Sequence, residues 1–351
     1  MDLFVEKILS WYDVHKRNLP WRNISDPYKI WVSEIILQQT RIAQGHDYYV
    51  RFIQAFPTVK DLASASEDEV LRQWQGLGYY SRARNMQKAA QTIVDEYEGI
   101  FPHTYEGVLA LKGVGPYTAA AICSFAYNLP HAVIDGNVYR VLSRYFGITD
   151  PIDSTKGKKL FAQLANKLLP AKRSADYNQA IMDFGAMQCT PQSALCEQCS
   201  LAYACIAYNN KCVTSLPIKC KSLKVTERYM AFIKIVTPQG VWLHKRQAND
   251  IWQGLYEFLL LEFDHAPSET EVMGHAWFNQ LKTSDKGTWR VIKKGFKHVL
   301  THRVIYADLY ELSFQRSTMP PADFVVVPIQ VLNHYAMPQL LQKLMMHDKL
   351  L

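Results

Sequence analysis

Four of the seven cysteines of this chain stand within one short stretch, CTPQSALCEQCSLAYAC, at residues 189–205. The gaps between them are six, two and five residues long, so any fold of this segment has to wrap it around one small object. The stretch holds too few large apolar residues to bury four unrelated cysteines. Thiolates at this density bind zinc or an iron–sulfur cluster. The candidate metal ligands are Cys189, Cys196, Cys199 and Cys205.

The start of the chain, MDLFVEKILSWYDVHKR, does not have the pattern of a secretory signal. It places Asp2 and Glu6 where such a signal carries positive charge, and it lacks a long apolar centre. We interpret it as an amphipathic helix, and no apolar run in the chain approaches the roughly 18 residues of a membrane span. We therefore expect a cytoplasmic protein without a membrane partner, in which thiols stay reduced and are free to bind a metal.

The spacing of the cysteines favours one kind of metal group over the other. Structural zinc sites usually pair their ligands as two short knuckles separated by a longer loop. Here a single C-x-x-C pair, Cys196 and Cys199, is flanked closely by the other two cysteines. This arrangement fits a [4Fe–4S] cluster better than zinc. Cys123 lies in an apolar run and is expected in a core, while Cys212 and Cys220 are too few for a second metal site.

The hydrophobic pattern divides the 351 residues into two parts, in line with a prior of roughly 150 residues per domain. Residues 1–206 contain periodic apolar segments separated by Pro, Gly and Asp, which predicts an all-α domain. Residues 207–228 have little periodicity and predict a linker. Residues 229–351 alternate in the manner of strands and end in a helical pattern, which predicts an α+β domain. The basic residues of the linker are Lys211, Lys219, Lys221, Lys224 and Arg228.

The segment LALKGVGPYTAAAI, residues 109–122, predicts a helix, a tight turn and a second helix. Gly113 and Gly115 tolerate positive φ and leave backbone amides uncovered, and Pro116 suits the first position of the next helix. The amides that open this helix then form an anion site, of the kind that holds a DNA backbone without reading sequence. An ordinary helix–helix corner is the alternative, and the formal net charge of +7 is compatible with both.

Two acidic residues have contrasting environments. Asp135, in VIDGNVYRVLSR, is expected at a helix N-cap, where amide donors lower the pKa of a carboxyl. Glu34, Gln38 and Arg41 are spaced as one face of a predicted helix, and the apolar neighbours of Glu34 would raise its pKa toward that of a general acid. A plain cap and a solvated polar stripe are the alternatives. One protonated and one ionised carboxyl is the pair that glycosidic-bond cleavage needs.

Several segments resemble one known family. The cysteine spacing is similar to that of the endonuclease III family of DNA repair glycosylases, and further segments resemble its MutY-type adenine DNA glycosylase branch. These segments are LPWR (19–22), WVSEIILQQTR (31–41), GLGYYSRARN (76–85), LKGVGPYTAAA (111–121) and VIDGNVYRVLSR (133–144). With the cysteine loop they cover most of residues 1–206. The resemblance implies a helix-hairpin-helix glycosylase domain that holds a [4Fe–4S] cluster.

The resemblance also implies a reaction and its residues. Glu34 would protonate N7 of adenine, and Asp135 would stabilise the oxocarbenium-like sugar or attack it transiently. Extrusion of the base is expected because the bond to be cut is shielded within the DNA stack. The partner is double-stranded DNA with adenine opposite 8-oxoguanine or guanine, bound by a monomer at the nucleoid. The supporting residues are Tyr117 and Asn137 beside the acids, Trp21 and Arg22 at the base, Gln39 and Tyr79 inserted into the duplex, and Gly113 and Gly115 at the backbone.

Tyr117 bears on the type of product. The lyase-capable relatives carry at this position a lysine that forms a Schiff base with the sugar, and a phenol cannot do so. We therefore expect an abasic site without efficient strand cleavage. A bifunctional pyrimidine glycosylase/lyase of the endonuclease III type is the alternative enzyme. A non-catalytic DNA-binding redox sensor is the alternative of another class, but it has no need of the two acids.

The second half resembles the carboxy-terminal domain of the same family, which is related in fold to Nudix hydrolases. The Nudix box needs a run of glutamates for Mg²⁺, whereas the stretch after Gly254 offers only Glu257 and Glu262, so pyrophosphohydrolase activity is not expected. In the family this domain recognises 8-oxoguanine through a Phe-Ser-His loop. The matching positions are Leu300, Thr301 and His302, and an ordinary strand pair is the alternative for Thr301 and His302.

Overall fold

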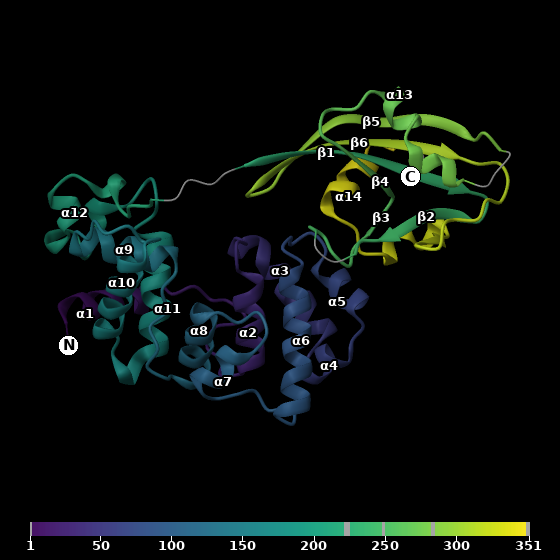
Figure 1. The fold of residues 1–351 in the computed structure, drawn as a ribbon. Coiled ribbons are helices and arrows are strands. Elements are labelled where there is room, and N and C mark those ends of the chain that lie inside the picture. The colour runs from purple at the N-terminus through teal and green to yellow at the C-terminus, as the bar shows by residue number, and fades with distance from the viewer. Residues whose placement is uncertain (1, 221–224, 248–249, 282–284, 349–351) are drawn as a thin grey trace. The chain divides into compact units, whose positions relative to one another are not determined.

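The computed structural model describes residues 2–220, 225–247, 250–281 and 285–348, and Lys221 and Lys224 of the expected linker lie outside them. Its internal contacts divide the chain into two units (Figure 1). The first unit comprises residues 1–64 and 85–222, and the second comprises residues 65–84 and 223–351. Along the described residues, no helix is both long and apolar enough to cross a bilayer.

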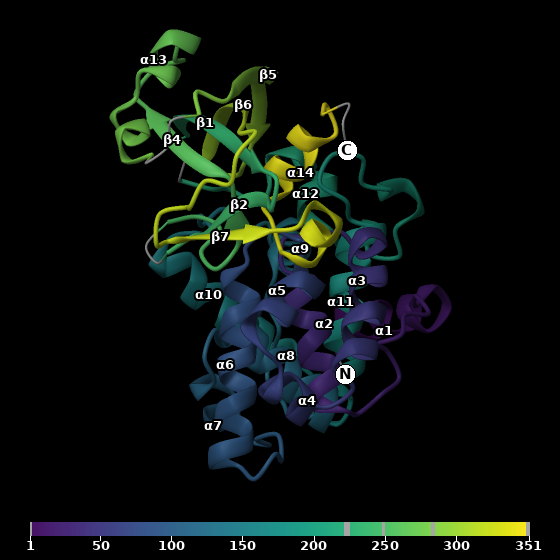
Figure 2. The same cartoon turned by 90° about the vertical axis from the view of Figure 1, so that its right-hand side faces the viewer.

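The first unit is built from helices and short 3₁₀ turns, which Figure 2 shows from a second side. Its helices, with α6 shared between the units, are α1 (Leu3–His15), α2 (Pro27–Ile36), α3 (Ile42–Ala55), α4 (Val59–Ser64), α6 (Ser81–Glu96), α7 (Tyr105–Ala110), α8 (Pro116–Tyr127), α9 (Gly136–Phe146), α10 (Thr155–Leu168), α11 (Ser174–Met187) and α12 (Ile206–Asn209). Its 3₁₀ turns are η1 (Ala171–Arg173), η2 (Cys196–Gln198), η3 (Ala202–Ala204) and η4 (Val213–Ser215).

Local sequence determines where three helices of this unit begin. Asp26 caps α2 and is followed by Pro27, whose missing amide donor is not needed in a first turn. Gly115 and Pro116 open α8 in the same way, although no side chain caps it. Asp135 caps α9 by accepting a hydrogen bond from the Val138 amide. Helix α2 packs against α8, and α11 packs against α1, α8 and α9, so these helices surround a common centre.

The second unit contains a mixed sheet, formed in its described part by seven strands in the order β3-β2-β1-β6-β5, with β4 beside β1 and β7 beside β2. β1 and β6 run parallel, and the pairs β1–β2 and β5–β6 are antiparallel. The strands are β1 (Thr226–Thr237), β2 (Gly240–Lys245), β3 (Tyr256–Glu257), β4 (Leu259–Phe263), β5 (Thr288–Val299), β6 (Arg303–Ser313) and β7 (Phe324–Val327). The remaining elements are α5 (Glu67–Trp74), α13 (Glu269–Met273), η5 (Ala276–Gln280), η6 (Ile329–His334) and α14 (Gln339–Met345).

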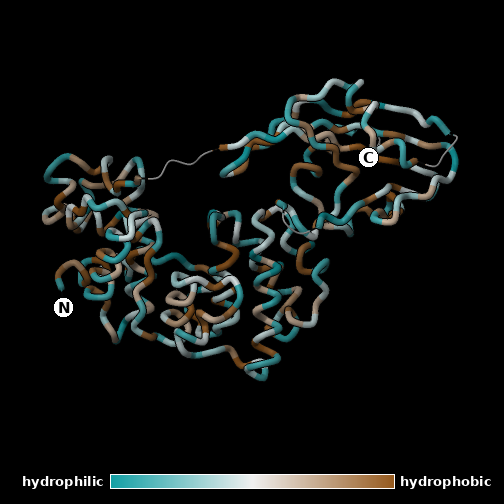
Figure 3. Tube along the Cα trace, viewed as in Figure 1, coloured by the Kyte–Doolittle hydropathy of each residue, from teal (hydrophilic) through white to brown (hydrophobic). Residues whose placement is uncertain are grey.

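Side chains of β1 alternate between two apolar cores, one on each face of the sheet, and Figure 3 colours the chain by hydropathy, with apolar residues in brown. Met230 and Phe232 pack into a core with Leu340 of α14, whereas Ala231 and Ile233 pack into a second core, which includes α13 and η5. A sheet covered on both faces requires strands that are apolar at successive positions, as MAFIKIV of β1 is. The predicted all-α first part and α+β second part are both confirmed.

Two details of the sequence prediction are corrected here. β1 begins at Thr226, so Arg228 lies in a strand and not in a linker, where it forms ion pairs with Asp250 and Glu262. Helix α2 ends at Ile36, so Gln38 and Arg41 do not continue one helical face with Glu34.

Candidate active site

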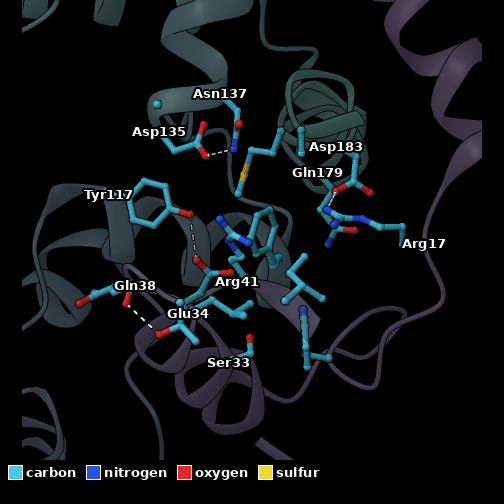
Figure 4. Close-up of a pocket in the computed structure, with 18 of the residues that line it drawn as sticks. Arg17, Ser33, Glu34, Gln38, Arg41, Tyr117, Asp135, Asn137, Gln179 and Asp183 are labelled. Atoms are coloured by element: carbon cyan, nitrogen blue, oxygen red, sulfur yellow. Dashed lines mark hydrogen bonds and ion pairs between the residues drawn. The ribbon is translucent and has the colours of Figure 1, made fainter. Parts of the chain in front are cut away.

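A cavity of about 780 Å³ opens in the first unit between α2, α8, α11 and the start of α9 (Figure 4). Its lining mixes apolar side chains with hydrogen-bonding groups, and its volume is in the range of small-molecule pockets. Of the residues predicted from the sequence, it brings together Trp21, Arg22, Glu34, Gln39, Tyr117, Asp135 and Asn137.

Glu34 lies near the end of α2 and is buried, with only 8% of its surface exposed. Burial raises the pKa of its carboxyl to about 7, although a hydrogen bond from Tyr117 and the charge of Arg22 oppose that rise. The Tyr117 hydroxyl donates to Oε2 of Glu34 over 3.1 Å. Burial also raises the pKa of the Tyr117 hydroxyl well above its usual value, so this group retains its proton and remains a donor. The sequence prediction of a raised pKa at Glu34 is confirmed.

Asp135 faces the same cavity from the N-cap of α9. Its Oδ1 accepts from the Val138 amide over 2.8 Å and its Oδ2 accepts from the Asn137 amide over 2.6 Å. The expected direction of its pKa shift is wrong, because burial raises the pKa of Asp135 while these hydrogen bonds and Arg140 lower it. Asp135 differs from Glu34 in its hydrogen-bond partners. Both oxygens of Asp135 accept a hydrogen bond, one from a backbone amide and one from an asparagine side chain.

Asn137 connects the site to the cysteine loop. Its Oδ1 accepts from Arg140 over 2.8 Å, and the same guanidinium donates to the carbonyls of Gly185 and Cys189 over 2.6 and 2.7 Å. Because the Asn137 oxygen is held by Arg140, its amide nitrogen is the atom turned toward Asp135. Arg140, through Asn137, thereby fixes the orientation of the Asp135 carboxylate.

The far wall of the cavity carries three polar residues that were not predicted from the sequence, Arg17, Gln179 and Asp183, and all three are connected to Arg22 or to one another. Arg22 donates to Asp183 over 3.0 Å, and Arg17 forms a second ion pair with that fully buried carboxylate. Arg22 also donates to the Tyr12 hydroxyl over 2.6 Å and to Oε1 of Gln179 over 3.0 Å. A detectable sequence signal was the pair Gln179 and Asp183, spaced four residues apart on α11 beside the buried apolar residues Ala180, Ile181 and Phe184.

The turn after α2 presents Gln39 to the cavity. Gln39 has a φ of 58°, a conformation that few side-chain-bearing residues adopt without support from their surroundings. Gln38 also lines the cavity, and its side chain donates to the Thr118 hydroxyl of α8 over 3.3 Å. Arg41 is the N-cap of α3 and also lines the cavity. The predicted polar stripe is therefore a helix end followed by a strained turn.

The predicted hairpin is formed by α7, a turn and α8. Gly113 has a φ of 79°, and a Cβ at this position would come within 2.7 Å of the Asn85 Cβ. Gly115 has an ordinary φ and open space where its Cβ would be. The turn thus requires glycine at Gly113 for its own geometry, while glycine at Gly115 leaves the start of α8 uncovered.

The four clustered cysteines line one small cavity next to α9. Arg144 donates to Sγ of Cys189 over 3.3 Å and to the Thr190 carbonyl over 2.7 Å, and the Leu201 amide approaches Sγ of Cys199 at 3.4 Å. Among the described residues, no three or more His, Cys, Asp or Glu side chains are grouped as ligands of a metal ion. The four cysteines nevertheless all line this one cavity.

The second unit holds the remaining predicted residues. Thr301 and His302 are exposed in the turn between β5 and β6 and not within a strand, so the strand-pair alternative is wrong. Tyr79 has a φ of 47° and is 48% exposed, and its hydroxyl lies 2.5 Å from that of Thr301. These three residues and Leu300 line a cavity of about 560 Å³.

The two glutamates after Gly254 are both held by arginines. Glu257 is buried and accepts from Arg246 over 2.6 Å, and Glu262 forms an ion pair with Arg228. A carboxylate neutralised by an arginine is a poor ligand for Mg²⁺, which prefers free oxygens and water. The absence of pyrophosphohydrolase activity stays a prediction.

Comparison with known proteins matches both units to described families. Residues 32–170 match the HhH-GPD superfamily of base excision DNA repair proteins, and residues 231–347 match the NUDIX domain. The adenine DNA glycosylase of Buchnera aphidicola subsp. Schizaphis graminum is 33% identical over 316 residues, covering 89% of this chain and 88% of that protein. The human adenine DNA glycosylase is 45% identical over 214 residues, covering 58% and 39%.

Solved structures resemble the helical part. A thermostable thymine-DNA glycosylase has 31% identity and a TM-score of 0.56, over 59% of this chain and 96% of that one. An endonuclease III in a non-covalent complex with DNA has 22% identity and a TM-score of 0.52, over 59% and 94%. The latter likeness concerns the fold alone.

Proposed function

The chain belongs to the adenine DNA glycosylases, enzymes of base excision DNA repair within the HhH-GPD superfamily, and from this membership we propose that it hydrolyses the bond between adenine and deoxyribose where adenine lies opposite 8-oxoguanine or guanine in duplex DNA. The observation that carries the mechanism is the buried Glu34, with a pKa of about 7, in the same cavity as the capping carboxylate Asp135.

The two carboxyls divide the reaction between them. Glu34 donates its proton to N7 of the bound adenine while the C1′–N9 bond breaks and its electron pair goes to the base. Asp135, ionised, stabilises the positive charge that develops on the sugar. A water molecule then adds at C1′, and its proton is lost as the abasic sugar forms. Tyr117 holds Glu34 in place over 3.1 Å, and Asn137 does the same for Asp135 over 2.6 Å.

The base reaches this cavity by leaving the duplex. Trp21 is buried and, with Arg22, lines the cavity that would receive it. Gln39 and Tyr79 both have positive φ, and both are side chains that we assign to the space left in the stack. The backbone strain at these two positions supports an inserting role, since strained residues persist where function requires them. The amides at the start of α8, with Gly113 and Gly115, hold a phosphate of the backbone.

The product is an abasic site in an uncut strand. Tyr117 occupies the position where an amine would be needed for Schiff-base chemistry, and its hydroxyl is already engaged with Glu34. The turn that carries Thr301 and His302 reads the base opposite adenine, with Leu300 in place of an aromatic residue. Exposure of this turn supports the assignment. Because the substrate is chromosomal DNA, we place the protein at the nucleoid in the cytoplasm.

The four cysteines are proposed to hold a [4Fe–4S] cluster, which offers one iron to each of four thiolates. The donor set fits, because all four cysteines line one cavity and Arg144, beside Cys189, offsets negative charge. Cys189, Cys196, Cys199 and Cys205 would be its ligands. When bound, such a cluster would organise the loop, since hydrolysis transfers no electrons.

The test is incubation of the full chain with duplexes carrying adenine opposite 8-oxoguanine, guanine or thymine, followed by alkali. We expect an alkali-dependent break at adenine in the first two duplexes, intact strands without alkali, and little borohydride-trapped adduct. Glu34→Gln and Asp135→Asn should bind the duplex and leave adenine in place. Efficient trapping would favour a bifunctional lyase instead, and wild-type turnover by Glu34→Gln would overturn the acid assignment. Equal amounts of iron and sulfide in the same preparation test the cluster, and their absence would contradict it.

A further inference from the structure

A chain of hydrogen bonds runs from α1 to the wall of the cavity that α11 forms, and the identity of each donor and acceptor determines its direction. Arg22 donates to Asp183 over 3.0 Å, to the Tyr12 hydroxyl over 2.6 Å and to Oε1 of Gln179 over 3.0 Å. The Tyr12 hydroxyl lies 2.7 Å from the same Gln179 oxygen. The chain thus starts at a buried carboxylate and ends at a side-chain amide that lines the cavity.

The polarity of this amide follows from the chemistry of arginine. A guanidinium has N–H donors and no acceptor, so the Gln179 atom that faces it must be the oxygen. Because Arg22 also donates to the oxygen of Tyr12, the Tyr12 proton is free to point at Gln179. Burial raises the pKa of the Tyr12 hydroxyl above its usual value, which keeps that proton in place. Gln179 Oε1 therefore accepts two hydrogen bonds, and its amide nitrogen has no partner among the described residues.

The position of Gln179 indicates which edge of a bound base this nitrogen meets. Figure 4 shows Gln179 and Asp183 across the cavity from Tyr117 and Asp135. The sugar of the extruded nucleotide has to face Asp135, so the base edge farthest from the sugar faces Gln179. On that edge adenine carries N1, a ring acceptor, whereas guanine carries an N1–H donor.

We infer that Tyr12 is a positioning residue for base selection, because with Arg22 it fixes the orientation of the Gln179 amide. In this orientation an N–H group of Gln179 faces N1 of adenine, which accepts a hydrogen bond. With guanine, the same N–H group would face the N1–H group of the base, which is also a donor. This inference rests on the proposed function and deepens it. Tyr12 acts without touching the substrate, because it does not line the cavity. Two donors facing each other leave both unpaired on burial, which costs more than a single hydrogen bond supplies.

The experiment compares single-turnover rates on adenine and on 1-deazaadenine, each opposite 8-oxoguanine, for the full chain and two variants. 1-Deazaadenine replaces N1 by C–H and retains N7. Tyr12→Phe removes the hydroxyl that holds Gln179, while Tyr177→Phe is the matched control. The Tyr177 hydroxyl is buried in the same core and lacks a hydrogen-bond partner among the described residues.

We expect Tyr12→Phe to lower the adenine to 1-deazaadenine rate ratio by about fivefold, as loss of one neutral hydrogen bond would, and Tyr177→Phe to leave the ratio unchanged. The inference is overturned if Tyr12→Phe slows both substrates by the same factor, since a merely structural role would do that, or if its ratio equals that of the wild type. If the wild type releases neither base, the proposed function has failed, which is a different outcome. Melting temperatures of the variants establish that each is folded.

Discussion

At the level of single residues, the reaction depends on Glu34, because burial keeps its carboxyl protonated up to about pH 7. Trp31, Ile35 and Ile36 flank Glu34 on α2 and are buried with it. The environment that raises its pKa could be predicted from the sequence, because these neighbours are local. The hydrogen bond from Tyr117 could not, since the two residues are 83 positions apart. Nor could the burial of Asp135, which reversed the expected direction of its pKa shift.

The raised pKa of Glu34 has a consequence for stability. The folded chain holds a proton on this carboxyl up to about pH 7, whereas the unfolded chain releases it near 4.5. The folded state therefore binds more protons between these values, and its stability falls as pH rises through that window, by up to about 3 kcal/mol. Glu34→Gln removes this dependence and retains an acceptor for Tyr117.

We accordingly predict that Glu34→Gln is inactive yet melts at a higher temperature than the wild type at pH 8, with the difference shrinking toward pH 5. Thermal unfolding of both proteins across that range measures it. An unchanged difference between pH 5 and 8 would show that the glutamate is not desolvated in the folded chain.

At the scale of elements, helix starts position the chemistry. Tyr117 is the second residue of α8, directly after Pro116. Asp135 is the N-cap of α9. Capping signals made both starts predictable. The end of α2 could not be predicted in this way. The apolar periodicity of its sequence continues past Ile36, whereas the helix ends there and Gln39 has a positive φ.

The hairpin before α8 gives a matched pair of substitutions. Gly113→Ala should destabilise the chain by about 1–3 kcal/mol, because the new Cβ requires a strained φ and meets Asn85 at 2.7 Å. Gly115→Ala enters open space at an ordinary φ and should leave the melting temperature nearly unchanged, while it weakens duplex binding by covering the phosphate site. Denaturant unfolding and duplex titration separate the two effects. Equal losses of stability in both variants would contradict this reading of the turn.

At the scale of the whole molecule, the change from helical to alternating patterns made the order of fold classes predictable. The assignment of residues 65–84 to the second unit could not be predicted, because it depends on contacts between residues that are far apart in the sequence. Lys245 forms an ion pair with Asp68 over 2.6 Å, and Tyr256 donates to the same carboxylate over 3.1 Å. The chain of Tyr12, Arg22, Gln179 and Asp183 escaped prediction for the same reason, since it joins α1 to α11 across more than 150 positions.

The central claim is that adenine leaves only when Glu34 carries a proton and Asp135 does not. The most direct measurement is the single-turnover rate of adenine release, opposite 8-oxoguanine, from pH 5 to pH 9 with duplex binding kept saturated. We predict a rate that falls by about tenfold per pH unit above a pKa near 7, as Glu34 loses its proton. A rate that stays level or rises from pH 7 to pH 9 would contradict it.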